Sequence, residues 1–305
     1  MPAKKPLLIC VVGPTAIGKT SLAIQLAKAF STEIISADSR QFYKEMSIGT
    51  AVPSEEELAA ARHHFIHNIS IFENYSVGDF ERDALRLLTE IFKKNNVAIM
   101  VGGSGLYIDA VVNGLDNFPE ISSEIRKQLN EELKENGIEV LQKELQRVDP
   151  VYFEKVDFHN PHRLIRALEI YRATGQPYSS FLRKESSKRD FETMFIGLTA
   201  ERETIYERIN MRVDKMLEDG LIDEAKSLYP HSEKNALQTV GYRELFEYFD
   251  GKISEEEAIS EIKKNTRRFA KRQNTWFKKN ESINWFNYKT DVSEIIHFIN
   301  EKNAR

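Results

Sequence analysis

The sequence predicts an α/β protein in which helices flank a parallel β-sheet, with an all-helical insertion in the middle of the chain. Two apolar runs rich in β-branched residues, Leu7–Val12 and Val97–Val101, are typical of strands that are covered on both faces. Stretches with helical spacing alternate with such runs, as they do in parallel sheets whose strands are joined by helices. A glycine-rich turn, Gly13–Thr20, follows the first run and leads into a helical stretch.

Five segments are expected to form the sheet. Besides the two runs above, the stretches at residues 33–37, 193–198 and 283–286 have the composition of strands. Apolar residues recur at helical spacing over residues 21–30 and again over residues 80–91, which predicts amphipathic helices there.

The middle of the chain, Asp116 to about Arg189, contains no run expected to be a buried strand. Charged segments with helical spacing occupy it, and the last has Pro161 at its start and Gly175 at its end, as helix termini prefer. The polar stretch Arg183–Asp190 suits the return crossing to the sheet. The expected domains are therefore a core of residues 1–115 and 190–305 and a helical insertion of residues 116–189.

The composition is that of an ordinary globular protein, since 41% of the 305 residues are hydrophobic and 30% are charged. The formal net charge of -4 gives no overall attraction to nucleic acid, so such a partner would need a local basic patch. The single cysteine, Cys10, excludes a disulfide framework. No run approaches the roughly 20 apolar residues of a membrane span. We therefore expect a cytoplasmic protein with no membrane partner, and a monomer.

The turn at residues 13–20 matches the phosphate-binding pattern Gly-x-x-x-x-Gly-Lys-Thr, between an expected strand and an expected helix. Its glycines let backbone N–H groups converge on phosphate oxygens, and the helix N-terminus adds partial positive charge. Lys19 supplies a point charge, and Thr20 can ligate Mg²⁺ or hydrogen-bond a phosphate. The pattern predicts a P-loop NTPase-like core without specifying the phosphate compound. The expected phosphate-binding residues are Gly13, Pro14, Thr15, Ala16, Ile17, Gly18, Lys19 and Thr20.

A conventional nucleoside triphosphatase also needs an acidic residue that holds magnesium near the end of a strand. Asp38, in the segment SADSRQ, is the comparable residue, because the strand Val97–Val101 ends in glycines. From the residues alone, Asp38 serves equally well as a metal ligand, as a base aimed at an acceptor or as a structural cap.

The segment Ile262–Lys279 carries eight basic residues and no acidic residue. Charge runs are usually solvated faces, but a run without any acid favours contact with RNA. Ile262, Phe269 and Trp276 fall at heptad spacing, so all three are expected to dock this helix on the core.

Seven blocks of the sequence, taken together, resemble one known family. They are GPTAIGKT, ISADSRQFYKEMSIGTAVP, VGGSGLYIDAVVNGL, NPHRLIRALEIYRATG, RVDKMLEDGLIDEAKSL, LQTVGYRELFEYFDG and TRRFAKRQNTWFK. In this order, spanning Gly13–Lys278, they resemble the tRNA dimethylallyltransferase (tRNA isopentenyltransferase) family, in its bacterial type without a zinc finger. The resemblance implies transfer of a dimethylallyl group from dimethylallyl diphosphate to N6 of the adenine immediately 3′ of the anticodon. The implied substrates are tRNAs that read codons beginning with uridine, and the products are N6-dimethylallyladenosine and diphosphate.

The resemblance also implies roles for individual residues. Lys19, Thr20, Mg²⁺ and Arg212 would act on the departing diphosphate, and Asp38 would be the base at the adenine amine. The inserted helices would hold the anticodon loop. Tyr242 could stack on a base, although an aromatic residue at its spacing is more often part of a core. The implied tRNA contacts are Asp38, Ser39, Arg40, Gln41, Gly103, Ser104, Arg126, His162, Arg163, Leu164, Ile165, Arg166, Gln238, Thr239, Val240, Gly241, Tyr242, Arg243, Arg268 and Arg272.

Three positions depart from the family pattern. Ile17 stands where the family usually has serine, Val52 where it has lysine, and Ser104 where it has threonine. Ser104 keeps a hydroxyl group, whereas Val52 removes a positive charge, so we assign Val52 no role.

Two other classes of protein share some of these features. A P-loop kinase of a nucleoside or small metabolite explains the loop, Asp38 and the helical insertion, but not the acid-free basic segment or the matched blocks. A nucleotide-switched RNA-binding protein would need a guanine-recognition motif such as Asn-Lys-x-Asp, and the sequence contains none.

Overall fold

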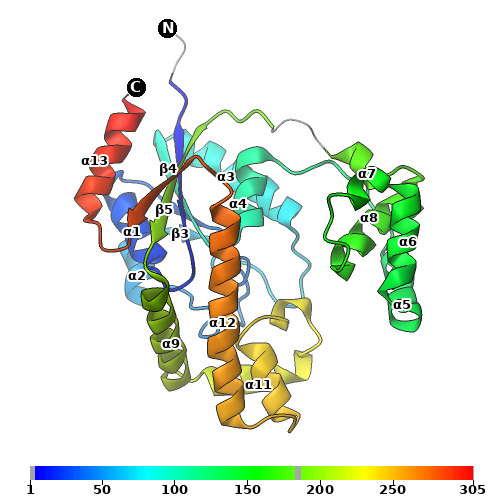
Figure 1. Ribbon diagram of the computed structural model, residues 1–305. Coiled ribbons are helices and arrows are strands. Elements are labelled where there is room, and N and C mark those ends of the chain that lie inside the picture. Colours follow the sequence, from blue (N-terminus) through cyan, green and yellow to red (C-terminus); the bar gives the residue numbers. More distant parts are fainter. Residues whose placement is uncertain (1–3, 183–186, 305) are drawn as a thin grey trace. The chain divides into compact units, whose positions relative to one another are not determined.

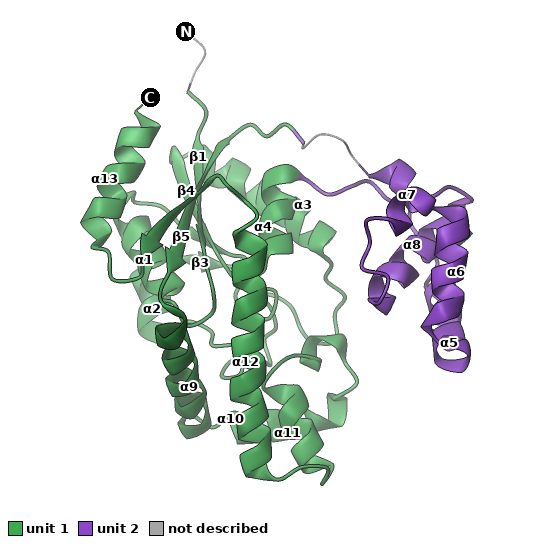
Figure 2. Ribbon diagram, viewed as in Figure 1, with its two compact units in different colours: residues 1–113, 188–305 green, residues 114–187 purple. Residues whose placement is uncertain are grey.

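The computed structural model of the chain describes residues 4–182 and 187–304 (Figure 1). It divides into two compact units, a large unit of residues 1–113 and 188–305 and a small unit of residues 114–187 (Figure 2). The boundaries expected from the sequence each fall two residues further along the chain than these. Within the expected return crossing, residues 183–186 lie outside the described residues.

A six-stranded sheet forms the centre of the large unit, with the strand order β3-β2-β4-β1-β5-β6. Every strand pair in it is parallel, which confirms the predicted parallel α/β fold. The strands are β1 (Leu7–Val12), β2 (Ile34–Ser36), β3 (His63–His64), β4 (Val97–Val101), β5 (Glu192–Thr199) and β6 (Ile283–Asn287). Five of these were expected from the sequence, whereas β3 has only two residues and is too short to leave a pattern.

Helices cover both faces of this sheet. The helices of the large unit are α1 (Lys19–Ala29), α2 (Glu55–Ala60), α3 (Val77–Phe92), α4 (Gly105–Asn113), α9 (Arg202–Glu218), α10 (Leu221–Leu228), α11 (Tyr242–Phe249), α12 (Glu255–Phe277) and α13 (Val292–Asn303). Leu7, Ile9 and Val11 share one core with α1 and α13, whereas Leu8 and Cys10 share another with α3 and α4. Because β1 is covered on both faces, its sequence is a continuous apolar run rather than an alternating one.

A third core lies beside the sheet, where α9, α10, α11 and α12 pack together (Figure 1). Tyr242, at the start of α11, is fully buried in it. Its hydroxyl donates to Glu224 Oε1 at 2.7 Å, and a Cβ atom added at Gly49 would lie 2.6 Å from its ring. Of the two alternatives expected for Tyr242, the core position is therefore confirmed, and stacking on a base and contact with tRNA are wrong, because its ring is enclosed by protein.

Glu224, on α10, fixes the loop that contacts Tyr242. Its carboxylate accepts hydrogen bonds from three successive backbone N–H groups, those of Ser47, Ile48 and Gly49, at 2.8–2.9 Å. Such a concave run of N–H groups is a favourable setting for an anion. One side chain therefore ties α10 and α11 to the loop that follows β2.

Helix α12 extends further toward the N-terminus than the basic segment and buries a different face from the one expected. Ile262 is buried, but Phe269 and Trp276 are 39% and 42% exposed. A seven-residue repeat rotates by about 20° per heptad on a straight helix. By Trp276 the repeat has therefore reached the edge of the buried stripe, and Ala270 and Phe277 are buried instead.

The small unit is a bundle of short helices with its own core. Its helices are α5 (Ser123–Asn136), α6 (Ile138–Val148), α7 (Pro150–Phe153), α8 (Pro161–Thr174) and the 3₁₀ turn η1 (Tyr178–Phe181). Arg172 joins three of them, because its guanidinium pairs with Glu132 and Glu144. Leu164 and Ile165 were expected to contact tRNA, but both are buried in this core, so their side chains cannot meet RNA.

Across residues 4–182 and 187–304, no helix combines the length and the apolar character needed to cross a bilayer.

Replacement of Glu224 by glutamine should destabilise the large unit by about 1–3 kcal/mol, because one amide oxygen cannot satisfy three N–H groups and a hydroxyl. Urea unfolding monitored by circular dichroism measures this. The matched control is Asp223→Asn, which changes the neighbouring exposed carboxylate on the same helix. Equal stability of the two variants would contradict the assigned role of Glu224.

Candidate active site

The phosphate-binding pattern forms a tight loop between β1 and α1. Gly13, Ala16 and Gly18 adopt positive φ angles of 141°, 62° and 105°. At Gly13 a side chain is also sterically excluded, because a Cβ atom there would lie 2.6 Å from the carbonyl oxygen of Leu198 on β5. Ile17 is buried in the core, which accounts for an apolar residue at this position of the loop.

Lys19, the first residue of α1, holds the loop from inside. Its ammonium group donates to the carbonyl oxygen of Pro14 at 2.7 Å. Burial, followed by repulsion from the Arg212 guanidinium, lowers the pKa of Lys19 to about 7, and attraction to Asp38 opposes this only in part. Positive charges therefore lie close together at the loop, and a bound anion would reduce the repulsion between them.

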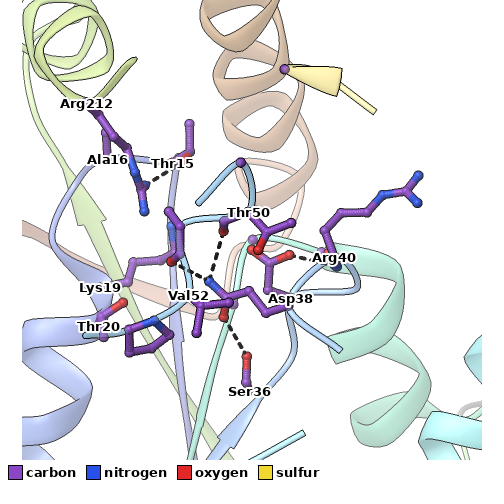
Figure 3. Close-up of a pocket in the computed structure, with 18 of the residues that line it drawn as sticks. Thr15, Ala16, Lys19, Thr20, Ser36, Asp38, Arg40, Thr50, Val52 and Arg212 are labelled. Carbon is purple, nitrogen blue, oxygen red and sulfur yellow. Dashed lines mark hydrogen bonds between the residues drawn. The ribbon is translucent and has the colours of Figure 1, made fainter. Parts of the chain in front are cut away.

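Two arginines on α9 complete the cluster. Arg212 donates to the Thr15 hydroxyl at 3.1 Å, and burial lowers its pKa, while Asp38 acts in the opposite direction (Figure 3). Arg208, one turn earlier, donates from Nε to the carbonyl oxygen of Ala16 at 2.7 Å. Arg208 was not predicted from the sequence, although its i,i+4 spacing from Arg212 places both on one helix face.

Asp38 lies just beyond the carboxyl end of β2, at the same edge of the sheet as the phosphate loop. Lys19 and Asp38 line the same cavity (Figure 3). One carboxylate oxygen, Oδ1, accepts from the Arg40 backbone N–H at 3.1 Å. This single contact fixes the orientation of Asp38 and leaves the carboxylate with further acceptor capacity.

The neighbours of Asp38 are mostly engaged in holding loops. Ser39 donates from its backbone N–H to the hydroxyl of Ser104 at 3.2 Å, which links the loops after β2 and β4. Gln41 donates to the carbonyl oxygens of Thr50 and Ala51 at 3.3 and 2.9 Å. The Arg40 guanidinium binds backbone carbonyl oxygens of residues 235 and 236, and in Figure 3 its side chain extends away from Lys19.

Gln273, on α12, is a second residue that the sequence analysis missed. Its side-chain oxygen accepts from the Thr15 backbone N–H at 2.8 Å, and its side-chain nitrogen donates to the Gly103 carbonyl at 3.0 Å. The side chain is buried. Its position within a strongly basic segment concealed it, because nothing in the sequence distinguishes it from a solvated polar residue.

A cavity of about 1440 Å³ in the large unit brings most of the predicted site residues together. Those that line it are Thr15, Ala16, Ile17, Gly18, Lys19, Thr20, Asp38, Ser39, Arg40, Gln41, Gly103, Ser104, Arg212, Gln238, Thr239, Val240, Gly241, Arg243 and Arg272. Gly13, Pro14, Tyr242 and Arg268 are not among the lining residues.

The remaining predicted residues belong to the small unit. Arg126 forms a bidentate pair with Glu169 at 2.6 and 2.8 Å, and Arg166 pairs with the same carboxylate. Glu169 is only 3% exposed, whereas the two arginines are 55% and 39% exposed. His162 and Arg163 are exposed at the start of α8. The cluster therefore presents two guanidinium groups, with one charge neutralised.

The described residues, 4–182 and 187–304, contain no group of three or more His, Cys, Asp and Glu side chains able to hold a metal ion. The cavity does offer the Thr20 hydroxyl and the Asp38 carboxylate. Magnesium commonly binds through one or two protein oxygens together with substrate phosphates. Thr20 alone would thus be sufficient to hold a magnesium ion that arrives with a diphosphate.

The site therefore presents three cations to the cavity, which Asp38 lines together with Glu55, Glu57 and Asp219. Lys19, Arg208 and Arg212 supply the positive charge. The arrangement suits stabilisation of negative charge that develops on a phosphate oxygen.

Comparison with known proteins agrees with this geometry. Residues 41–280 match the model of the family described as IPP transferase. The chain is 61% identical over 295 residues to the tRNA dimethylallyltransferase of Christiangramia forsetii, covering 97% of this chain and 98% of that protein. It is 58% identical over 301 residues to the enzyme of the same name from Flavobacterium psychrophilum, covering 97% and 98%.

Solved structures give the same result. The full-length tRNA isopentenylpyrophosphate transferase of Bacillus halodurans is 39% identical, with a TM-score of 0.73 and coverage of 98% of this chain and 97% of that one. A eukaryotic dimethylallyltransferase solved acting on tRNA is 28% identical, with a TM-score of 0.77 and coverage of 94% and 75%. The family match, the close relatives and the shared fold lead to one conclusion: the chain belongs to the IPP transferase family.

Proposed function

We infer that this protein is a tRNA dimethylallyltransferase. It transfers a dimethylallyl group from dimethylallyl diphosphate to N6 of the adenine immediately 3′ of the anticodon, in tRNAs that read codons beginning with uridine. The observation that carries the inference is the cavity in which a cationic phosphate cradle and the carboxylate of Asp38 lie together. Close relatives over nearly the full length are named for this activity. We expect it to act as a monomer in the cytoplasm.

The phosphate loop and its cations would bind the diphosphate as a leaving group. As the allylic carbon–oxygen bond breaks, negative charge grows on the diphosphate oxygen. Donors fixed in the empty site need no reorganisation at that moment, so they favour the transition state over the ground state. Lys19, Arg208 and Arg212 fit this role through their charge, and Thr20 through its hydroxyl. Magnesium, when bound with the diphosphate, would neutralise part of its charge and would be held by Thr20.

Asp38 would act on the adenine amine. The N6 nitrogen forms a bond to the allylic carbon while the carbon–oxygen bond to diphosphate breaks, and N6 then loses one proton. A carboxylate hydrogen-bonded to N6 raises its electron density and can accept that proton. The backbone contact from Arg40 keeps Asp38 oriented for this task.

The basic half of α12 and the arginines of the small unit would contact the RNA. Arg268, Lys271, Arg272, Lys278 and Lys279 are all exposed, whereas Lys263 pairs with Asp214 and Lys264 with Glu261. Phosphate contacts of this kind would offset the cost of taking the adenine out of its stack, a few kcal/mol in general. Arg126, His162, Arg163 and Arg166 would contribute from the small unit.

The activity itself can be tested with unmodified tRNA, Mg²⁺ and either dimethylallyl diphosphate or ATP. We expect mass spectrometry of nuclease digests to show one dimethylallyl group on the adenine 3′ of the anticodon, without any requirement for ATP. Phosphorylation of a nucleoside or metabolite that depends on ATP, with no prenylated RNA, would instead identify a kinase.

Replacement of Asp38 by asparagine should lower the single-turnover rate by about 100-fold or more, because the amide cannot accept the N6 proton. The affinity for tRNA should change little, since asparagine keeps the shape of the side chain. Asp223→Asn, outside the cavity, is the control for general effects of losing a carboxylate. A rate near that of the unaltered protein would remove Asp38 from the role of base.

The pKa of Lys19 predicts a pH dependence. Since this pKa is lowered to about 7, the ammonium loses its proton as the pH rises through 7, and the attraction for diphosphate falls. The kcat/KM for dimethylallyl diphosphate should therefore decline above about pH 7, by up to about tenfold per pH unit. In Lys19→Gln protein, the same measurement should give a lower value without this decline. A decline of equal steepness in that variant would assign it to another group.

A further inference from the structure

Three large apolar side chains line the cavity while remaining exposed, and the proposed chemistry does not use them. They are Leu106 at the start of α4, which is 49% exposed, and Phe269 and Trp276 on α12, which are 39% and 42% exposed. Exposed apolar side chains that gather at one place on a surface mark a binding site more often than chance. Phe269 and Trp276 lie seven residues apart, two turns along one side of α12.

Trp276 is held in place although its ring is exposed. Its indole Nε1 donates to Asp109 Oδ2 at 3.1 Å. The ring also lies directly on Gly105, where an added Cβ atom would come within 2.2 Å of Nε1. A ligand that packs on this ring would therefore meet a surface that is already ordered, and would lose little affinity to the entropy of fixing it.

This ring is also connected to the residues around Asp38. Gly105 follows Ser104, whose hydroxyl accepts the backbone N–H of Ser39, the residue after Asp38. On α12, one turn before Trp276, Gln273 binds the carbonyl oxygen of Gly103. The first contact joins the loop after β4 to the loop that carries Asp38, and the second holds α12 against the loop after β4. A flat group on Trp276 would thus lie at a defined position next to the reaction site.

The charge around these rings indicates the kind of partner. The Arg272 guanidinium lies 5.6 Å from the centre of the Phe269 ring, an arrangement in which a cation and an aromatic face support each other. Arg268 and Lys271 are exposed on the same helix, and Lys278 and Lys279 are exposed directly after its end. Aromatic rings interleaved with cations suit a chain of flat bases joined by phosphates, because single-stranded nucleic acid binds by base stacking and phosphate contacts together.

We propose that Trp276 and Phe269 form a stacking platform for an unpaired base of the RNA, adjacent to the adenine that receives the dimethylallyl group. The proposal rests on the proposed function and deepens it. The cationic cradle holds the diphosphate, and Asp38 faces the amine. The platform holds a neighbouring base of the anticodon loop, which keeps the extruded adenine at a fixed position relative to both.

The first test uses the fluorescence of Trp276. The chain has two tryptophans, so Trp285→Phe leaves Trp276 as the only one. Titration of this protein with a synthetic anticodon stem-loop RNA should quench its fluorescence, because a stacked base quenches indole emission. Saturation with RNA without a change in emission would overturn the proposal.

The second test measures affinity. Trp276→Leu should raise the Kd for the stem-loop by about 5- to 100-fold, the range for loss of one base–aromatic stack. Trp276→Phe should recover most of that loss, whereas the KM for dimethylallyl diphosphate at saturating RNA should stay unchanged in both. Phe72→Leu is the matched control, since Phe72 is a 57% exposed aromatic side chain that does not line the cavity.

The outcomes separate this proposal from the proposed function. An unchanged Kd in Trp276→Leu, or an unchanged Kd with a raised KM for dimethylallyl diphosphate, would overturn the platform and, in the second case, place Trp276 in the donor pocket. Should Trp276→Leu fail to fold by circular dichroism, the quenching result and the Trp276→Phe affinity decide the matter. Absence of prenylated RNA with the unaltered protein would reject the proposed function alone.

Discussion

The site depends on one buried amide, that of Gln273. Its oxygen accepts the Thr15 N–H of the phosphate loop and its nitrogen donates to Gly103 after β4, so a single side chain of α12 holds two strand-end loops together. A buried amide satisfied on both sides is costly to disturb, because any movement of one loop leaves a polar group without a partner. The relative positions of the phosphate cradle and the basic helix are therefore set before any substrate binds.

That rigidity explains how three cations can remain close together. Lys19 and Arg212 are partly buried, and desolvation lowers the pKa of both. Repulsion from Arg212 adds to this effect at Lys19, and repulsion from Arg208 adds to it at Arg212. Backbone carbonyls of Pro14 and Ala16 hold Lys19 and Arg208 in place. The folded structure holds these cations together despite their mutual repulsion. A bound diphosphate would reduce that repulsion. Such preorganised charge favours a leaving group more than the intact donor.

Features that depend on local sequence pattern could be predicted from the sequence. Features that depend on contacts between residues distant in the chain could not. The strands, the phosphate loop and Asp38 follow from apolar runs, glycine spacing and position after a strand. Tyr242 appeared available for stacking, yet Glu224 and Gly49 enclose it, and both are distant in the chain. Phe269 and Trp276 fit a heptad that the straight helix does not follow. No sequence pattern identifies Gln273, because the two loops that it binds are distant from it in the chain.

The end of β4 shows most clearly how this core departs from a nucleoside triphosphatase. A strand-end acid for magnesium is absent there, and the packing leaves no room for one. A Cβ atom at Gly102 would lie 2.4 Å from the carbonyl oxygen of Ala37, and one at Gly103 would lie 2.1 Å from the Gln273 amide. The close approach of the Asp38 loop thus requires glycine at position 102, whereas a side chain at position 103 would displace the Gln273 amide. The same packing that excludes a second acid places Asp38 opposite the cradle. In the proposed function, an acid in that place would face the attacking amine, and the phosphate loop would hold the departing diphosphate.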